Sequence, residues 1–209
     1  IDPETLKPVP RDGETIGEIV LRGNICMKGY LKNEKATQEA FAGGWFHTGD
    51  IGEIVGNGFL KITDRKKEIF KTAGGKYVAP QTLENKFKES PLVEQVMVIG
   101  ENRKFPSALI VPNFPALEAW CEKKGIAYTN PEQMVQNSEV LDKYQREVDR
   151  YNASFGRWEQ VKKFKLLTKE WSIDAGEMTP KLSLKRKVIY ERNLPLIEQI
   201  YADLENGKI

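Results

Sequence analysis

The sequence predicts an α+β fold in which a small β-rich segment, residues 1–65, precedes a compact mixed α/β domain, residues 66–209. The pattern changes between the two parts. Up to Asp64, short apolar runs are separated by glycine-rich turns, whereas beyond Lys67 apolar strands alternate with amphipathic helices. With 209 residues, 40% of them apolar, the chain is long enough for one or two hydrophobic cores.

The first part is predicted to contain strands, tight turns and one short helix. Residues 17–23 form a glycine-bounded strand, and residues 33–41 form a helix with Asn33 as its N-cap. Two further strands, 51–54 and 59–62, flank Gly56-Asn57-Gly58. That tripeptide favours a hairpin, because asparagine and glycine tolerate positive φ.

The second part begins with a helix at Pro80, whose Leu83 and Phe87 share one face. Residues 93–99 and 107–111 are apolar enough to form the centre of a sheet. The other predicted elements are a helix over 115–124, an amphipathic helix whose apolar stripe is Leu141, Tyr144, Val148, Tyr151 and Phe155, a strand over 164–167, and a helix over 184–204 that breaks at 193–195.

Composition excludes several classes of function. Charged residues make up 30% of the chain but nearly cancel at +2, so we expect no general polyanion binder. Cys26 and Cys121 are far apart and predict free thiols in a reducing compartment, without a metal site. No apolar run is long enough to span a bilayer, and the first residues lack a signal peptide. We therefore expect a segment of a longer, cytoplasmic protein.

Three motifs carry the chemistry. The first is Gly44-Trp45-Phe46-His47-Thr48-Gly49-Asp50, and the second runs from Asp64-Arg65-Lys66-Lys67 through Thr72-Ala73-Gly74-Gly75-Lys76-Tyr77 to Pro80. The third is Leu182-Ser183-Leu184-Lys185-Arg186-Lys187. In this order they resemble the late core motifs of the adenylate-forming ligases, which include acyl-CoA synthetases, luciferase-like enzymes and peptide-synthetase adenylation domains. The resemblance covers nearly the whole chain and implies the carboxy-terminal part of such an enzyme.

By this resemblance, Asp50 and Arg65 bind the ribose hydroxyls of ATP. A carboxylate in a turn after a glycine can accept two hydrogen bonds from a cis-diol, and a guanidinium can serve both the hydroxyls and a nearby phosphate. The alternatives are an Asx-turn at Asp50 and a surface salt bridge at Arg65. His47 is the only histidine, and we expect it to pack or orient rather than to act as a base.

The resemblance also implies a change of domain orientation between the two half-reactions, and it assigns residues to that change. Lys67 lies where the family has its hinge, which absorbs the backbone rotation between adenylation and thioester formation. Gly74, Gly75 and Lys76 lie in the loop that lines the pantetheine tunnel of coenzyme A, where glycine allows close backbone approach. An ordinary glycine turn is the alternative.

Lys185 is the predicted catalytic residue of the first half-reaction. In the family, a lysine here reaches the substrate carboxylate and the α-phosphate, and a cation between two anions lowers the barrier to their reaction. Leu184 replaces the glycine that usually precedes this lysine in the family's Ser-Gly-Lys motif. The neighbouring Lys181, Arg186 and Lys187 leave open which cation serves, and a solvated basic helix start is the alternative.

A helical insertion at about 113–160 makes the chain most similar to long-chain fatty acyl-CoA ligases. The resemblance implies fatty acid, ATP with Mg²⁺ and coenzyme A as reactants, and the preceding large AMP-binding domain as a partner, of which residues 1–65 would be the last β-rich part. The family's phosphate loop and adenine-stacking motif have no match here. We therefore expect the isolated chain to be inactive, since positioning supplies most phosphoryl-transfer catalysis.

Two other functions compete with this one. Residues Lys181–Lys187 could form a basic patch for anionic lipid or nucleic acid, although the balanced charge and the lack of interleaved aromatic residues argue against nucleic acid. The chain could also be the tail of an aryl or peptide-synthetase adenylation domain. Peripheral membrane contact is compatible with an enzyme of fatty acids.

Overall fold

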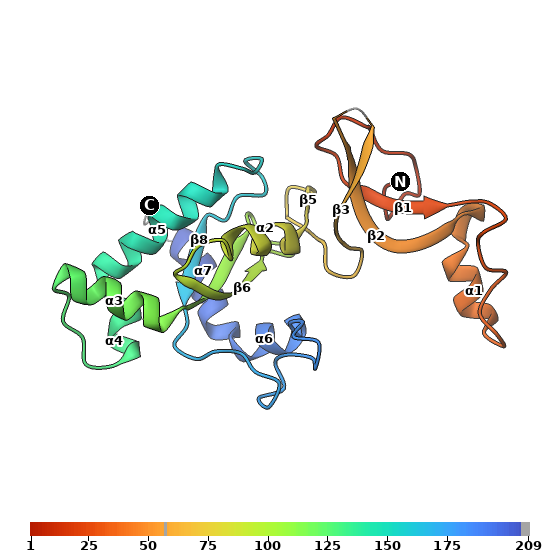
Figure 1. The fold of residues 1–209 in the computed structure, drawn as a ribbon. Helices are drawn as coiled ribbons and strands as arrows, with labels where there is room; N and C mark the ends of the chain where they lie inside the picture. Colours follow the sequence, from red (N-terminus) through yellow and green to blue (C-terminus); the bar gives the residue numbers. More distant parts are fainter. Residues whose placement is uncertain (57, 206–209) are drawn as a thin grey trace. The chain divides into compact units, whose positions relative to one another are not determined.

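The computed structural model describes residues 1–56 and 58–205, and the chain forms two compact units, Ile1–Ile69 and Phe70–Ile209 (Figure 1). The first unit is mainly strand and the second mixes helices and strands, so the predicted α+β architecture is confirmed. The tip of the hairpin predicted at Gly56-Asn57-Gly58 includes Asn57, which lies outside the described residues.

The first unit is an antiparallel three-stranded sheet in the order β1-β2-β3. Its elements are β1 (Gly17–Leu21), α1 (Glu34–Ala40), the 3₁₀ turn η1 (Ala42–Gly44), β2 (Phe46–Val55) and β3 (Phe59–Arg65). Asn33 caps α1 as predicted, since its Oδ1 accepts the Ala36 N–H at 3.0 Å. The pairing of β2 with β3 brings Asp50 opposite Arg65.

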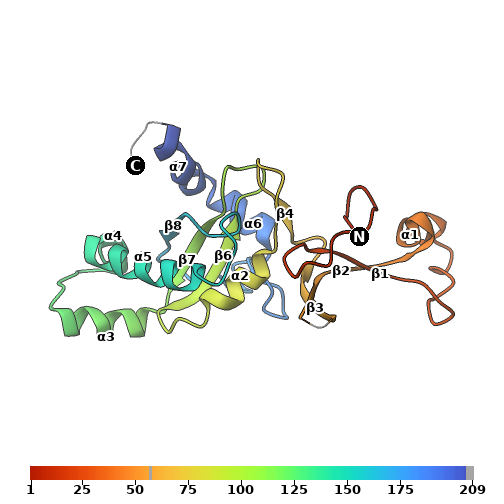
Figure 2. The ribbon, with the colours of Figure 1, turned by 90° about the horizontal axis from the view of Figure 1, so that it is seen from above.

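The second unit contains a three-stranded sheet in the order β6-β7-β8 and the small hairpin β4-β5. Its strands are β4 (Phe70–Lys71), β5 (Tyr77–Val78), β6 (Val93–Ile99), β7 (Ser107–Pro112) and β8 (Lys163–Leu166). Its helices are α2 (Pro80–Phe87), α3 (Phe114–Lys124), α4 (Pro131–Gln136), α5 (Ser138–Asn152), α6 (Arg186–Arg192) and α7 (Leu194–Glu205). Strand β7 runs antiparallel to β6 and parallel to β8, so α3, α4 and α5 form the crossover between two parallel strands (Figures 1 and 2).

Helices cover both faces of this sheet, and the alternation of side chains along each strand divides the core in two. Val96 and Val98 of β6 face the first core, while Met97 and Ile99 face the second. The first core is closed by α2, α3, α4 and α5, and the second by α6, α7 and the segment around Trp171. Because both faces are covered, β7 is buried along its whole length and the second half of β6 is uniformly apolar, whereas β8 has two lysines.

Several sequence predictions are corrected in detail. Strand β7 is central, but β6 lies at an edge; burial on both faces makes an edge strand as apolar as a central one. The crossover holds three helices instead of two, because α4 is too short to show a period. On α5 the stripe includes Val140, which is fully buried, whereas Leu141 is 36% exposed. The break between α6 and α7 at Asn193 is confirmed.

Candidate functional site

Asp50 and Arg65 lie directly opposite each other on β2 and β3, and their side chains form an ion pair. Arg65 Nη1 donates to Asp50 Oδ1 at 2.5 Å, and the two side chains are 64% and 30% exposed for Arg65 and Asp50 respectively. The structure thus brings these two predicted residues together at a solvent-accessible point. Lone pairs on the carboxylate and further N–H groups on the guanidinium are geometrically available to one ligand.

The surroundings of Asp50 differ from the prediction. The sequence suggests a turn, but Asp50 lies within β2, after Gly49 with φ of +73°. The Thr48 hydroxyl donates to the Ile19 carbonyl at 2.7 Å and accepts the Asp50 N–H at 3.1 Å. A threonine and a left-handed glycine therefore shape a kink inside the strand that sets the direction of the carboxylate.

Sequence reasoning missed a buried carboxylate beside this pair. Glu18 of β1 is 3% exposed and accepts hydrogen bonds from His47 Nδ1 at 2.7 Å and Lys66 Nζ at 2.8 Å. Burial would raise the pKa of Glu18, but the hydrogen bonds and charges of Lys66 and His47 outweigh it and lower that pKa. His47 thus orients a carboxylate, in agreement with the orienting role expected of it. The one signal in the sequence was a charged residue within an apolar strand.

The predicted pantetheine loop is the exposed turn between β4 and β5. Gly75 has φ of +76°, which favours glycine, whereas a Cβ on Gly74 would meet only the Thr72 hydroxyl, at 3.9 Å. The Ala73 N–H donates to the Arg103 carbonyl at 2.8 Å, which ties the loop to the turn before β7. Lys76 Nζ lies 5.6 Å from the ring centroid of Trp158. The base of the loop is fixed and its glycines are open to solvent.

Lys185 is the N-cap residue of α6, at the foot of a tight hairpin. Its N–H donates to the Glu177 carbonyl at 2.8 Å, and the hairpin turns at Leu182, whose φ is +60°. The side chain is exposed, and within the described part of the chain the structure gives its ammonium group no hydrogen bond or ion pair. Lys185 is therefore an unneutralised cation on a fixed backbone.

The Arg186 side chain, in contrast to that of Lys185, points into the interior of the second unit. Its Nη2 donates to Glu84 Oε2 at 2.6 Å and its Nη1 to the Val98 carbonyl at 3.3 Å, while the Val98 N–H donates to Glu84 Oε1 at 2.7 Å. Burial raises the pKa of Glu84, and the Arg186 guanidinium opposes that rise. Arg186 is therefore paired inside the fold, and of the basic run Lys181–Lys187 the three lysines remain exposed.

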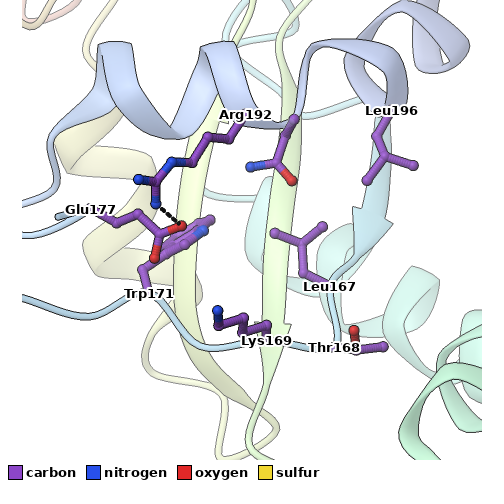
Figure 3. Close-up of a pocket in the computed structure, with 8 residues that line it drawn as sticks. Leu167, Thr168, Lys169, Trp171, Glu177, Arg192 and Leu196 are labelled. Carbon is purple, nitrogen blue, oxygen red and sulfur yellow. Dashed lines mark hydrogen bonds and ion pairs between the residues drawn. The ribbon is translucent and has the colours of Figure 1, made fainter. Parts of the chain in front are cut away.

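A cavity of about 230 Å³ lies elsewhere in the second unit (Figure 3). Its lining residues are Leu167, Thr168, Lys169, Trp171, Glu177, Arg192, Asn193 and Leu196. The Arg192 guanidinium donates to Glu177 at 2.9 Å across it, as the dashed line in Figure 3 shows. None of the predicted site residues lines this cavity, so we assign it no part in the predicted chemistry.

Residues 1–56 and 58–205 contain no group of three or more His, Cys, Asp or Glu side chains that could hold a metal ion. Within the same residues, no helix combines the length and apolar character needed to cross a bilayer. Cys26 and Cys121 are both free thiols, as predicted.

Comparison with known proteins identifies the family. The family model described as "AMP-binding enzyme C-terminal domain" matches residues 67–205. The chain belongs to this family. Its match begins at the residue predicted as the hinge and includes the Gly74–Lys76 loop and Lys185.

Curated relatives of this AMP-binding C-terminal domain include fatty-acid ligases. The chain is 39% identical over 199 residues to long-chain-fatty-acid–CoA ligase FadD15 of Mycobacterium tuberculosis, covering 93% of the chain and 33% of that protein. It is 36% identical over 209 residues to human long-chain-fatty-acid–CoA ligase 1, covering 98% of the chain and 30% of that protein. The chain thus spans about a third of the length of these relatives.

Solved structures agree on the fold of this family member. The adenylation domain of a carboxylate reductase from Mycobacterium chelonae superposes with a TM-score of 0.68 at 27% identity, over 92% of this chain and 28% of that one. A didomain of the carboxylic acid reductase from Segniliparus rugosus, solved in complex with AMP, superposes with a TM-score of 0.69 at 26% identity. The superposition covers 93% of this chain and 26% of the didomain. The fold of this chain is therefore similar to part of two carboxylate reductase structures.

Proposed function

We propose that this chain is the carboxy-terminal part of an AMP-forming long-chain fatty acyl-CoA ligase, called the parent ligase below. In the first half-reaction the fatty acid carboxylate attacks the α-phosphorus of ATP and releases pyrophosphate. In the second, the coenzyme A thiol attacks the acyl-adenylate carbonyl and releases AMP. Relatives named as long-chain-fatty-acid–CoA ligases, which align with 93% and 98% of the chain, support this substrate class.

The observation that carries the proposal is the ion pair of Asp50 and Arg65, 15 residues apart in sequence and 2.5 Å apart in space. Together they present a carboxylate and a guanidinium to one ligand at a solvent-accessible point where β2 pairs with β3. We assign them the ribose hydroxyls of ATP, with Asp50 accepting from the diol and Arg65 donating to it. The pairing keeps each side chain in place before the nucleotide arrives, which lowers the ordering cost of binding.

The test is the ATP dependence of AMP formation by the parent ligase with fatty acid and coenzyme A. Asp50→Ala should raise the KM for ATP by about 10-fold or more, because a hydrogen bond to a charged group is worth about 1.5–3 kcal/mol and each 1.4 kcal/mol is tenfold. Glu53→Ala is the matched control, since Glu53 is a carboxylate of the same strand that pairs with Lys61 instead. Equal effects of the two substitutions, or no fatty-acid-dependent AMP at all, would refute the assignment.

We assign Lys67 the hinge, close to the predicted boundary between residues 1–65 and 66–209. Lys67 is exposed in the turn that follows β3, and the structure divides two residues later, at Ile69 and Phe70. An exposed turn residue close to the boundary of a compact unit can absorb a large backbone rotation without breaking a core. The loop of Gly74, Gly75 and Lys76 then serves the second half-reaction by lining the path of the pantetheine arm.

Replacing Gly74 with leucine should slow thioester formation from preformed acyl-adenylate by about 100-fold, while fatty-acid-dependent exchange of pyrophosphate into ATP stays within about twofold. The fold should survive, because the new Cβ meets only Thr72 Oγ1, at 3.9 Å, and Gly74 does not have positive φ. Stopped-flow thiolysis and exchange assays on the parent ligase measure the two steps separately. Equal slowing of both steps would rule out a loop dedicated to the second one.

The other reactants follow from the same proposal. ATP brings Mg²⁺ on its phosphates; the described residues offer no group of three metal ligands, so we assign no metal-binding role to this chain. The preceding AMP-binding domain, the fatty acid and coenzyme A are the remaining partners, in a cytoplasmic protein that can contact membranes peripherally. The alternative of a lipid- or nucleic-acid-binding patch at Lys181–Lys187 is disfavoured because Arg186 is paired with Glu84.

A further inference from the structure

Glu18 stands out because the ribose and hinge assignments do not use it, although it is a buried charge. It lies on β1, its side chain is 1% exposed, and a single oxygen, Oε2, accepts from both Lys66 Nζ and His47 Nδ1. Removing a carboxylate from water is unfavourable unless cations and hydrogen-bond donors replace the lost hydration. Lys66 and His47 supply that compensation, so the cluster joins β1 to β2 and to the residue that follows β3.

His47 is held on both sides. Its Nε2 lies 3.1 Å from the Ala42 carbonyl oxygen, within hydrogen-bonding distance. Its Nδ1 faces the Glu18 carboxylate at 2.7 Å. The ring therefore ties Glu18 to the segment that leads into β2, and the same carboxylate oxygen also accepts from a cation.

That cation is Lys66, which lies between the proposed ribose ligand Arg65 and the proposed hinge Lys67. Its main-chain N–H also donates to the Gly49 carbonyl at 2.8 Å, directly before Asp50. Lys66 is thus fixed at its backbone to the strand of Asp50 and at its side chain to β1. Lys67, by contrast, is exposed, and among the described residues the structure gives its side chain no hydrogen bond or ion pair.

We propose that Glu18 is a positioning residue that, through Lys66, fixes the main chain up to the hinge, so that rotation begins at Lys67 and leaves the pair of Asp50 and Arg65 undisturbed. This inference rests on the proposed function, because it gives Arg65 its ribose and Lys67 its hinge. The ribose contact would then keep one geometry in both half-reactions, while the second unit changes its orientation.

The first test uses the 209-residue chain and needs no activity. Trypsin must bind the lysine side chain it cleaves after, and the Lys66 ammonium is occupied by Glu18 at 2.8 Å. Glu18→Gln should speed cleavage after Lys66 by about 10-fold relative to cleavage after Lys67, because the neutral amide holds the ammonium less strongly. Glu53→Gln, which weakens the ion pair with Lys61 in the same sheet, is the matched control and should leave the ratio unchanged. An unchanged ratio in Glu18→Gln would overturn the inference.

The second test uses the parent ligase, well below its melting temperature. Glu18→Gln and Lys66→Met should each raise the KM for ATP by about 10-fold or more, since small displacements of binding groups are costly, while the KM for coenzyme A stays within about twofold. Lys66→Met is included in case Glu18→Gln does not fold. It should fold, because Lys66 is partly exposed and methionine preserves the apolar part of its side chain. A purely structural role would lower kcat without this selective change in KM. If the variants are active and their KM for ATP is unchanged, the inference is overturned but the proposed function stands. If the wild-type parent ligase is inactive, both the proposed function and the inference are overturned.

Discussion

Replacing Lys185 with alanine in the parent ligase is expected to reduce the rate of acyl-adenylate formation by about 100- to 1,000-fold, the usual cost of removing one preorganised charge-stabilising group. The fatty acid carboxylate and the α-phosphate are both anionic, and a cation between them offsets their repulsion as they approach. Lys185 suits this task because its ammonium is not neutralised within the described residues, while its backbone is fixed by the bond to Glu177. Thiolysis of preformed acyl-adenylate should stay within about twofold of wild type.

The neighbouring cations provide the controls for this experiment. Lys187→Ala removes an exposed cation whose nearest acid, Glu191, is 4.0 Å away, and it should leave both half-reactions nearly unchanged. Rapid quench with radiolabelled ATP measures adenylation, and thioester release from synthetic acyl-adenylate measures the second step. If Lys187→Ala proved as damaging as Lys185→Ala, the assignment of one catalytic lysine would be wrong.

Breaking the Glu84–Arg186 pair is expected to have the largest effect on stability. Arg186→Ala should lower the free energy of unfolding of the second unit by about 3 kcal/mol, because it leaves a carboxylate buried without its cation. The Glu84 side chain is 6% exposed and also holds the Val98 N–H, so it cannot turn to water without disturbing β6. Lys187→Ala, at the next position, should cost less than about 0.5 kcal/mol.

Hydrogen exchange in the 209-residue chain measures the free energy of unfolding of the second unit separately from that of the first. The Val98 amide should lose protection in Arg186→Ala in step with the rest of β6 and β7. A double variant, Glu84→Leu with Arg186→Met, removes both charges and should recover most of the loss. If Arg186→Ala left exchange at Val98 unchanged, the buried pair would not contribute to stability as described.

Arg186 also shows why position in the sequence alone does not separate the proposed catalytic cation from its neighbours. Residues Lys181–Lys187 look like one basic run, yet Lys185 faces solvent and Arg186 reaches Glu84, 102 residues away. The different directions of these two side chains depend on the start of α6 at Arg186 and on how α6 packs over the sheet. A linear motif can nominate a group of cations, but only the fold distinguishes them.

Other features were predictable because their causes are local. The apolar strands β6 and β7, the Asn33 cap and the helix break at Asn193 follow from neighbouring residues and short periods. Glu18 and Lys66 lie 48 residues apart and are joined by strand pairing, which no local pattern encodes. The same holds for the kink at Asp50, where Thr48 bonds to a strand 29 residues earlier.

The most direct test of the whole account is fatty-acid-dependent exchange of pyrophosphate into ATP, measured on the 209-residue chain and on the parent ligase side by side. The chain carries the proposed ribose pair, the proposed hinge and Lys185, but its sequence contains no phosphate loop or adenine-stacking motif. We expect exchange by the parent ligase and none above the blank by the chain alone, because half of the positioning groups are absent. Robust exchange by the isolated chain would contradict the account.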